Sequence, residues 1–185
     1  MSASTDLELV EMFRRGNEAS FNELVLRYQE KLYWIARRFV QDHDEADEIV
    51  QEVFVKIYGA LKEFRGESGV FTWLYRITVN VSLNTLRKKR LREFLRIDEF
   101  FETAGEESEQ PDKLFEREEQ HALLEEAMRT LPEKQKTVFI LRYYEELPYE
   151  EISAILKTSV GGLKANYFHA VKKIGEYVKR AHRTY

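Results

Sequence analysis

Apolar residues recur three and four positions apart along most of the chain, which is the pattern of amphipathic helices. Thr5 and Glu8 form a capping box and predict the start of a first short helix. The spacing then predicts a long second helix over residues 21–39 and a third from about 44 to 64, which has an acidic start at 42–48 and a buried stripe over 49–64. After a glycine-containing break, a fourth helix is predicted over about 71–95. These four helices suffice for one small domain.

The periodicity stops after this point and resumes only near residue 114. Pro132 and Pro148 each stand where a helix can begin. A short helix and a long one follow Pro148, separated by the tight connection Lys157-Thr158-Ser159, which is typical of a helix-turn-helix. We therefore predict an all-α protein with two small helical domains, residues 1–95 and 114–185, joined by an acidic flexible linker at 96–113.

The charge distribution removes an objection to nucleic-acid binding. The 185 residues carry a formal net charge of −4, but residues 1–95 are neutral, 96–119 carry −7 and 120–185 carry +3. The acidity therefore lies in the linker. The chain has no cysteine, which excludes disulfides and thiolate metal sites. It shows neither a signal peptide nor an apolar run of membrane-spanning length, and we expect a cytoplasmic protein.

Residues 64–92 combine three kinds of side chain that suit DNA whose strands are separating. Aromatic residues can stack on bases, exposed amides can read base edges, and cations can meet phosphates. The amides are Asn80 and Asn84, and five of the six residues 87–92 are Lys or Arg. For Trp73 and Tyr75 the residues alone leave two interpretations open, DNA contact and core packing.

The second, longer helix of the helix-turn-helix has one polar face. Ser159 is a good N-cap, and the side chains opposite the apolar stripe include Lys164, Phe168 and Lys172. Phe168 lies off the stripe, where contact with thymine methyl groups would explain it. The alternative is a helical hairpin inside an ordinary bundle.

Together these segments resemble the extracytoplasmic-function (group IV) sigma factors of bacterial RNA polymerase, in the sigma-70 family. The first domain resembles sigma region 2 through DEADEIVQEVFVKIY and FRGESGVFTWLYRITVN, and the second resembles region 4 through SVGGLKANYFHAVKKI. The resemblance covers nearly the whole chain.

The resemblance implies a protein that is not an enzyme and needs no cofactor or metal. It would bind the β′ coiled coil and β flap of core RNA polymerase and contact promoter DNA, both as duplex and as non-template single strand. An anti-sigma factor would hold it inactive. The residues matching the polymerase-binding positions are Glu48, Gln51 and Glu52.

The resemblance also implies which residues meet the promoter. In this interpretation the 65–70 loop, flanked by two phenylalanines, would hold a flipped base. The residues for the −10 element and melting are Phe64, Arg65, Phe71, Trp73, Arg76, Asn80, Asn84, Arg87, Lys88, Lys89 and Arg90. Those for the −35 element are Arg142, Ser159, Lys164, Ala165, Phe168, His169 and Lys172. Ala165, Asn166 and Gly162 depart from the residues usual in relatives, so the −35 sequence stays open.

Two other classes of protein compete with this interpretation. A stand-alone helix-turn-helix regulator would need a dimer interface, and it would leave the first domain unexplained. An enzyme or metal protein would have to use the acidic cluster at residues 42–48 or the pair His121 and Glu125. The acidic cluster fits the start of a helix better, because its charge complements the helix dipole.

Overall fold

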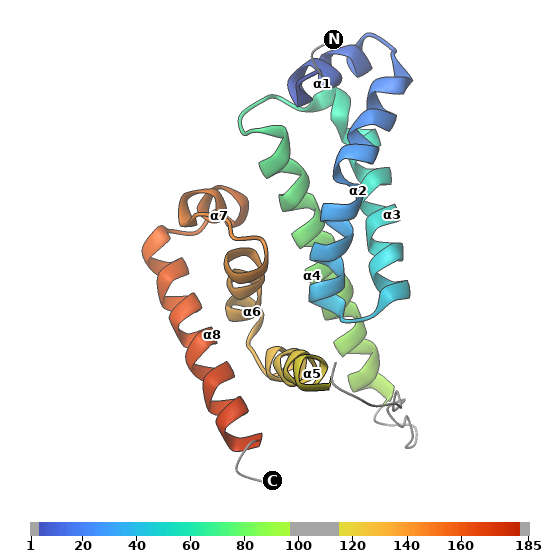
Figure 1. Cartoon of the computed structure of the whole chain (residues 1–185). Coiled ribbons are helices and arrows are strands. Elements are labelled where there is room, and N and C mark those ends of the chain that lie inside the picture. Colours follow the sequence, from blue (N-terminus) through green and yellow to red (C-terminus); the bar gives the residue numbers. More distant parts are fainter. Residues whose placement is uncertain (1–3, 97–114, 182–185) are drawn as a thin grey trace.

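The computed structural model describes residues 4–96 and 115–181, and every regular element in these ranges is helical. The first domain consists of α1 (Asp6–Arg14), α2 (Glu18–Val40), α3 (His43–Ala60), the 3₁₀ turn η1 (Leu61–Glu63) and α4 (Val70–Arg96). The second consists of α5 (Phe115–Arg129), α6 (Glu133–Phe139), the π-helical turn η2 (Ile140–Tyr144), α7 (Tyr149–Leu156) and α8 (Val160–Ala181). The predicted all-α fold with two helical domains is confirmed (Figure 1). The linker predicted at 96–113 lies almost wholly outside the described residues.

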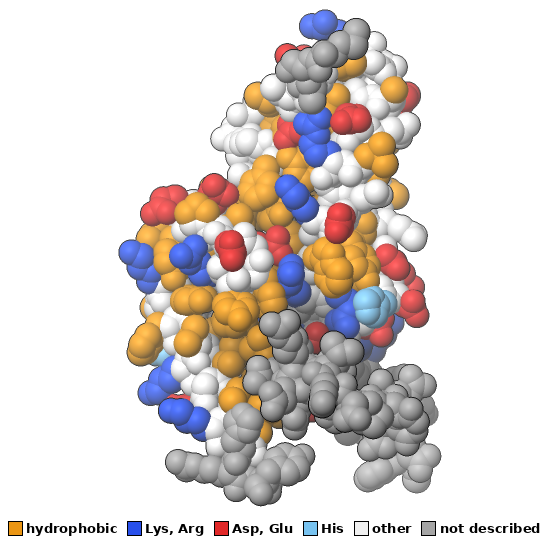
Figure 2. All heavy atoms as spheres, in the orientation of Figure 1, with side chains coloured by type: hydrophobic (Ala, Val, Ile, Leu, Met, Phe, Trp, Pro, Cys, Tyr) orange, Lys and Arg blue, Asp and Glu red, His pale blue; other side chains and the backbone are white. Residues whose placement is uncertain are grey.

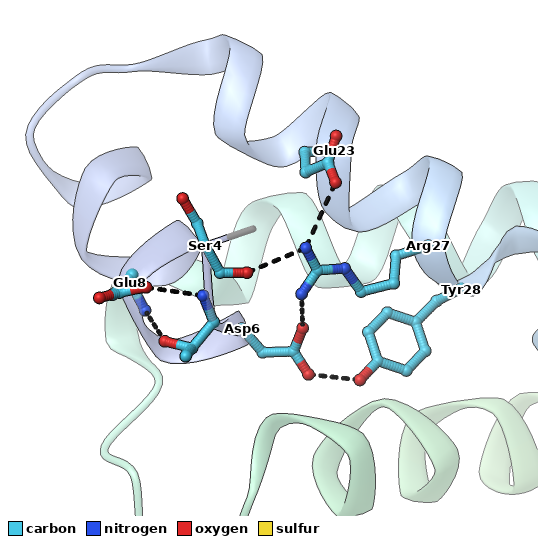
Figure 3. Close-up of polar contacts among 7 residues, drawn as sticks. Ser4, Asp6, Glu8, Glu23, Arg27 and Tyr28 are labelled. Carbon is cyan, nitrogen blue, oxygen red and sulfur yellow. Dashed lines mark hydrogen bonds and ion pairs between the residues drawn. The ribbon is translucent and has the colours of Figure 1, made fainter. Parts of the chain in front are cut away.

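Helix α1 begins with the capping box that the sequence predicts. The Thr5 hydroxyl accepts from the Glu8 amide (3.3 Å), and the Thr5 amide donates to the Glu8 carboxylate (2.6 Å). Asp6 then ties α1 to α2, because its carboxylate accepts from Arg27 (2.6 Å) and from the Tyr28 hydroxyl (Figure 3). This polar network joins the start of α1 to the middle of α2.

Helix α2 forms the centre of the first domain and packs against α1, α3 and α4. Its apolar stripe includes Leu32, Ile35 and Ala36, which are completely buried. Residues of α3 and α4 complete this core, and Ile49, Val53 and Ile57 lie at the three- and four-residue spacing expected of one helix face. The stripes predicted from the sequence are therefore the core of the domain.

The connection between α2 and α3 is only two residues long. Gln41 ends α2 in the left-handed conformation, with φ of 59°. Asp42 then caps α3, because its carboxylate accepts from the Glu45 amide (2.8 Å). The acidic start predicted for the third helix thus serves as a helix cap and complements the dipole.

The second domain has its own smaller core. Helix α8 packs along α6 and α5 through Leu163, Ala170 and Ile174, while Ile152 and Ile155 of α7 close one end. Both prolines stand at helix N-caps, as the sequence predicts, because α6 begins after Pro132 and α7 begins after Pro148. Among the described helices, none has an apolar stretch long enough to cross a bilayer.

The two domains touch along α2 and α4 of the first and α5 to α7 of the second (Figure 1). The contact is rich in polar groups. Arg38 pairs with Glu145, whose carboxylate also accepts from the Tyr75 hydroxyl (3.3 Å). Burial raises the pKa of the Glu145 carboxyl. Figure 2 shows basic and acidic side chains interspersed over one face of the molecule, with no single large patch of either charge.

Lys136 is the most deeply buried cation in the described part of the contact. Lys136 is 7% exposed, and its Nζ donates to the Phe39 carbonyl (2.8 Å) near the end of α2. Burial lowers the pKa of Lys136 to about 8, and the nearby guanidinium groups of Arg90 and Arg129 act in the same direction. The ammonium is therefore less favoured in the folded chain than in the unfolded one.

This lowered pKa predicts how stability depends on pH. Above pH 8, native Lys136 releases its proton while the unfolded chain, with its ordinary pKa of 10.5, keeps it. The unfolded state then binds more protons, so the free energy of unfolding rises, by about 2 kcal/mol between pH 8 and pH 10. Denaturant unfolding across this pH range gives the free energy of unfolding of wild type and of Lys136→Met. The difference between the two isolates the contribution of Lys136, because the tyrosine titrations are common to both proteins and cancel.

The matched control is Lys134→Met, the same change at an exposed position of α6. It should keep the wild-type pH dependence. If wild type and Lys136→Met change in parallel between pH 8 and pH 10, the lowered pKa is wrong.

Candidate nucleic-acid interface

A hollow of about 290 Å³ lies where the loop after η1 meets α4. Its walls combine an aromatic side, charged side chains and loop residues. The lining residues are Ala60, Glu63, Phe64, Arg65, Glu67, Ser68, Trp73 and Arg76. An aromatic wall and a polar rim suit the binding of one planar group that forms hydrogen bonds.

Trp73 contributes both to the core and to the hollow. Its ring lies 5.1 Å from that of Phe64, which is 6% exposed, and it packs against the buried cluster while lining the hollow. Phe71, expected to flank this loop pocket, does not line the hollow; its ring lies 4.1 Å from that of Tyr75. The aromatic wall is thus made by Phe64 and Trp73.

An arginine from α1 fixes the loop beneath the hollow. Arg14 donates from Nε to the carbonyl of Lys62 (3.2 Å) and from Nη2 to the carbonyl of Phe64. The loop then turns at Gly66, whose φ of 70° is left-handed and favours glycine. The sequence pattern did not identify Arg14, because some fifty residues separate it from the loop.

Helix α4 carries a line of polar side chains beside the hollow. We call Arg76, Asn80, Asn84 and Arg87 the α4 polar row, since their three- and four-residue spacing places them along one face. Asn80 and Asn84 are exposed. Arg87 donates to Asn84 Oδ1 (3.4 Å) and to the Glu133 carboxylate of α6, and Arg76 donates to backbone carbonyls of α7. The structure therefore brings the predicted readers and cations together.

The basic end of α4 remains largely accessible. Lys88 and Arg90 are exposed, whereas Lys89 forms an ion pair with Glu45 of α3 (2.7 Å). Arg65, at the other end of the interface, is exposed on the loop.

The predicted polymerase-binding residues lie on the outer face of α3. Glu48, Gln51 and Glu52 are all exposed, and Glu52 pairs with Lys56 (3.3 Å). Val55 continues this face and is 73% exposed. Val55 was not predicted as part of this face, although its position one turn after Gln51 was a signal for it. An exposed apolar residue beside carboxylates suits contact with a protein partner.

On α8 the predicted polar face is exposed and continuous. It presents Lys164, Ala165, Phe168, His169 and Lys172, with Phe168 64% exposed. The Ser159 hydroxyl accepts from the Gly162 amide (3.3 Å), which confirms the predicted cap. A Cβ at Gly162 would lie 3.2 Å from this hydroxyl, so the tight helix start favours glycine.

Two other residues near this face are engaged within the second domain. Arg142 donates from Nη1 to the Leu147 carbonyl (3.0 Å) and lies 5.3 Å from the Tyr149 ring. Asn166 donates to the Gly162 carbonyl (2.8 Å) of its own helix. Arg142 is half-buried, so its guanidinium would have to leave the Leu147 carbonyl to make the predicted DNA contact.

Within the described ranges, no group of three or more His, Asp or Glu side chains is arranged to hold a metal ion. At the start of α3, Asp42 forms the helix cap and Glu45 pairs with Lys89. His121 belongs to α5, but its side chain lies outside the described residues.

Comparison with known families matches both domains in order. Residues 24–92 match the model of sigma-70 region 2, and residues 121–174 match that of sigma-70 region 4. The chain belongs to the ECF branch of the sigma-70 family. It is 38% identical to the ECF RNA polymerase sigma-E factor of Escherichia coli over 95% of both chains. It is 37% identical to the RNA polymerase sigma-H factor of Pseudomonas aeruginosa over 94% of both.

Solved structures of similar shape agree with this sigma factor fold. The structure of CnrH in complex with the cytosolic domain of CnrY aligns with a TM-score of 0.71 at 22% identity, covering 95% of this chain and 97% of that one. The sigma factor RpoE of Bartonella quintana, in complex with the anti-sigma factor NepR, aligns with a TM-score of 0.66 at 23% identity, covering 86% and 96%. At these identities the likeness supports the fold.

The glycine at the turn of the loop gives a direct test of its geometry. Gly66→Ala should lower the free energy of unfolding by about 1 kcal/mol, because alanine is strained at a left-handed φ. Gly69→Ala, in the same loop without a left-handed φ, should leave stability unchanged or slightly higher. Denaturant unfolding of both variants measures this. Equal stabilities would contradict the assigned turn.

Proposed function

We propose that this ECF sigma factor binds core RNA polymerase in the cytoplasm, directs it to promoters with defined −10 and −35 elements, and helps to open the DNA. The observation that carries the proposal is the α4 polar row, which begins at Arg76 in the wall of an aromatic hollow and carries two exposed amides one and two turns farther along the helix. The proposal describes an initiation factor rather than an enzyme, acting without a cofactor.

The hollow suits a base that has left the duplex. Extruding a base costs a few kcal/mol, and an aromatic wall with a polar rim can offset this cost. Trp73 supplies a face for stacking, and the loop from Arg65 to Ser68 supplies polar groups for the base edge. Phe71 contacts Tyr75 beside the start of α4 and does not line the hollow. Opened non-template DNA is therefore the proposed ligand of this site.

The α4 polar row would read and hold the same strand. Asn80 and Asn84 can form paired hydrogen bonds with base edges, as amide side chains do with adenine. Arg76 and Arg87 stand at the ends of the row. The exposed Lys88 and Arg90, with Lys89, would contact phosphates without regard to sequence.

Helix α8 would enter the major groove at the −35 element. In a helix-turn-helix the second helix meets base edges through its N-terminal residues. Ser159, Lys164 and Ala165 lie in this part, and Phe168 and His169 follow one turn later. The exposed Phe168 ring suits a thymine methyl group, and Lys172 suits a phosphate.

The exposed α3 face with Glu48, Gln51 and Glu52 is the proposed contact with the β′ coiled coil, and the second domain would meet the β flap. An anti-sigma factor is a further proposed partner. Two neighbours in fold were solved with partner proteins, CnrH with CnrY and RpoE with the anti-sigma factor NepR. For this chain the same kind of partner is an inference from family membership.

Polymerase binding is the first test. Gln51→Arg places a cation between two carboxylates on the α3 face and should weaken binding to core polymerase by about tenfold, or ~1.4 kcal/mol. Gln29→Arg makes the same change at an exposed position of α2 and should bind as wild type does. Competition for labelled core polymerase measures both.

If the wild-type chain fails to bind core polymerase but binds duplex DNA tightly alone, it is a stand-alone regulator and the proposal is wrong. If Gln51→Arg and wild type bind equally well, the polymerase contact lies elsewhere than on α3.

Base reading by α4 is the second test. Asn80→Ala should change the preferred base at one −10 position, with discrimination falling by about 1–3 kcal/mol, because a paired amide contact is lost. Transcription from a set of −10 variants measures this. Asn22→Ala, which changes an exposed amide on α2, is the control. An equal loss on every −10 variant for Asn80→Ala would refute base reading.

Lys172→Ala should instead weaken DNA binding to all promoter sequences and lower the salt slope of that binding by about one.

A further inference from the structure

Both arginines of the α4 polar row are bound by groups of the second domain. Arg76 donates from Nη2 to the carbonyl of Ala154 (2.6 Å) and from Nε to that of Ile155 (3.3 Å). Arg87 donates from Nε to one carboxylate oxygen of Glu133 (3.0 Å) and from Nη2 to the other. The two cations proposed to meet DNA are therefore already engaged within the chain.

The groups bound to Arg76 are backbone carbonyls, whose partial negative charge is reinforced at the C-terminal end of a helix. Ala154 and Ile155 lie in the last turn of α7, where backbone carbonyls have no amide partner within the helix. The chain leaves α7 at Lys157 in a left-handed conformation, with φ of 51°. The carbonyls at this end also carry the negative end of the helix dipole. Two such oxygens around one guanidinium resemble the oxygens of a phosphate.

The group bound to Arg87 is a carboxylate in the two-bond arrangement. A guanidinium binds carboxylate and phosphate with the same fork of parallel hydrogen bonds. Glu133 is the first residue of α6, so the start of that helix is directed at α4. Its position in the fold is fixed by Pro132 on one side and by the buried Lys136 one turn later.

The two contacts bracket the predicted readers. Arg76 and Arg87 are eleven residues apart, or about 16 Å along a helix at 1.5 Å per residue. Asn80 and Asn84 lie between them, with α7 packed along this side of α4. A DNA strand with phosphates at both arginines would have to take the place of Glu133 and of the end of α7.

We infer that in the free chain the second domain occupies the two arginines at the ends of the α4 polar row, with Glu133 and the α7 carbonyls in the places of phosphate oxygens. The −10 strand and the second domain therefore compete for the same two arginines. This inference rests on the proposed role of α4 in −10 binding.

The remaining contacts between the domains suit reversible opening. They include several hydrogen bonds: Lys136 to the Phe39 carbonyl, Gln41 to the Glu125 carbonyl (2.9 Å) and Arg129 to Gln41 (2.7 Å). Polar contacts between domains permit relative motion more readily than a shared apolar core does. The apparent affinity for the strand is then the affinity of the open form multiplied by the fraction of molecules that are open.

Two labels on the full-length chain can follow opening directly. Because the protein has no cysteine, Gln29→Cys on α2 and Lys179→Cys on α8 introduce only the two intended thiols. Both positions are exposed and away from the proposed binding residues. Fluorescence energy transfer between the labels reports the separation of the domains, and polarisation of a labelled single-stranded −10 oligonucleotide reports binding.

Glu133→Gln and Glu133→Lys should lower energy transfer and tighten oligonucleotide binding, in that order of effect, by about fivefold for the lysine variant. The controls are Glu126→Gln and Glu126→Lys, which change charge equally within the second domain. Glu126 accepts from Tyr177 (3.0 Å) and does not contact α4. The oligonucleotide should also lower energy transfer in the parent chain, since coupling between two binding events is reciprocal.

Energy transfer that stays unchanged in both Glu133 variants would overturn the inference, as would equal tightening in the Glu126 controls. Reduced transfer with no oligonucleotide binding by any variant would have a different meaning. It would overturn the −10 role of α4 proposed above while leaving the contact between the domains established.

Discussion

Helix α4 has to be held firmly from one side while keeping polar side chains available on the other. Its inner face buries Leu74 and Val79 against α2 and α3. The same face buries two hydroxyls, and both are satisfied within the helix: Thr78 donates to the Leu74 carbonyl (3.0 Å) and Ser82 to the Thr78 carbonyl (2.9 Å). These two hydroxyls need no partner outside α4, whereas the buried Tyr75 hydroxyl donates to Glu145 of the second domain. The hollow, the polar row and the contact with the second domain all follow from this arrangement.

Local features of the fold could be predicted because they depend on residues close in sequence. The Thr5 cap, the helix starts at Pro132 and Pro148, and the buried stripes all arise from spacing within a turn or two. The π-helical turn at residues 140–144 could not be predicted in this way. It inserts an extra residue per turn in a segment where Tyr144 packs against the core while Tyr143 is exposed, and spacing alone does not show such a choice.

The site was predicted in its residue types but not in its contacts. Asn80 and Asn84 were identified from helical spacing, and both are exposed. The bonds from Arg14 to the loop and from Arg76 to α7 join segments about fifty and eighty residues apart. A lone arginine in a sequence gives no sign of such a partner. The same limit applied to Phe71, because which of several nearby aromatic rings lines a hollow is decided by packing.

The residue that ends α2 has a second role with an energetic consequence. Gln41 adopts a left-handed conformation in which glycine is favoured. Its side-chain amide donates to the Glu125 carbonyl and accepts from Arg129, both in α5. A glycine there would form a better helix end but would leave the amide contacts to α5 unmade. Robustness of the first domain and affinity between the domains are therefore opposed at this one position. Gln41 thus gives up stability at the end of α2 and in return contributes two of the hydrogen bonds that hold the closed arrangement.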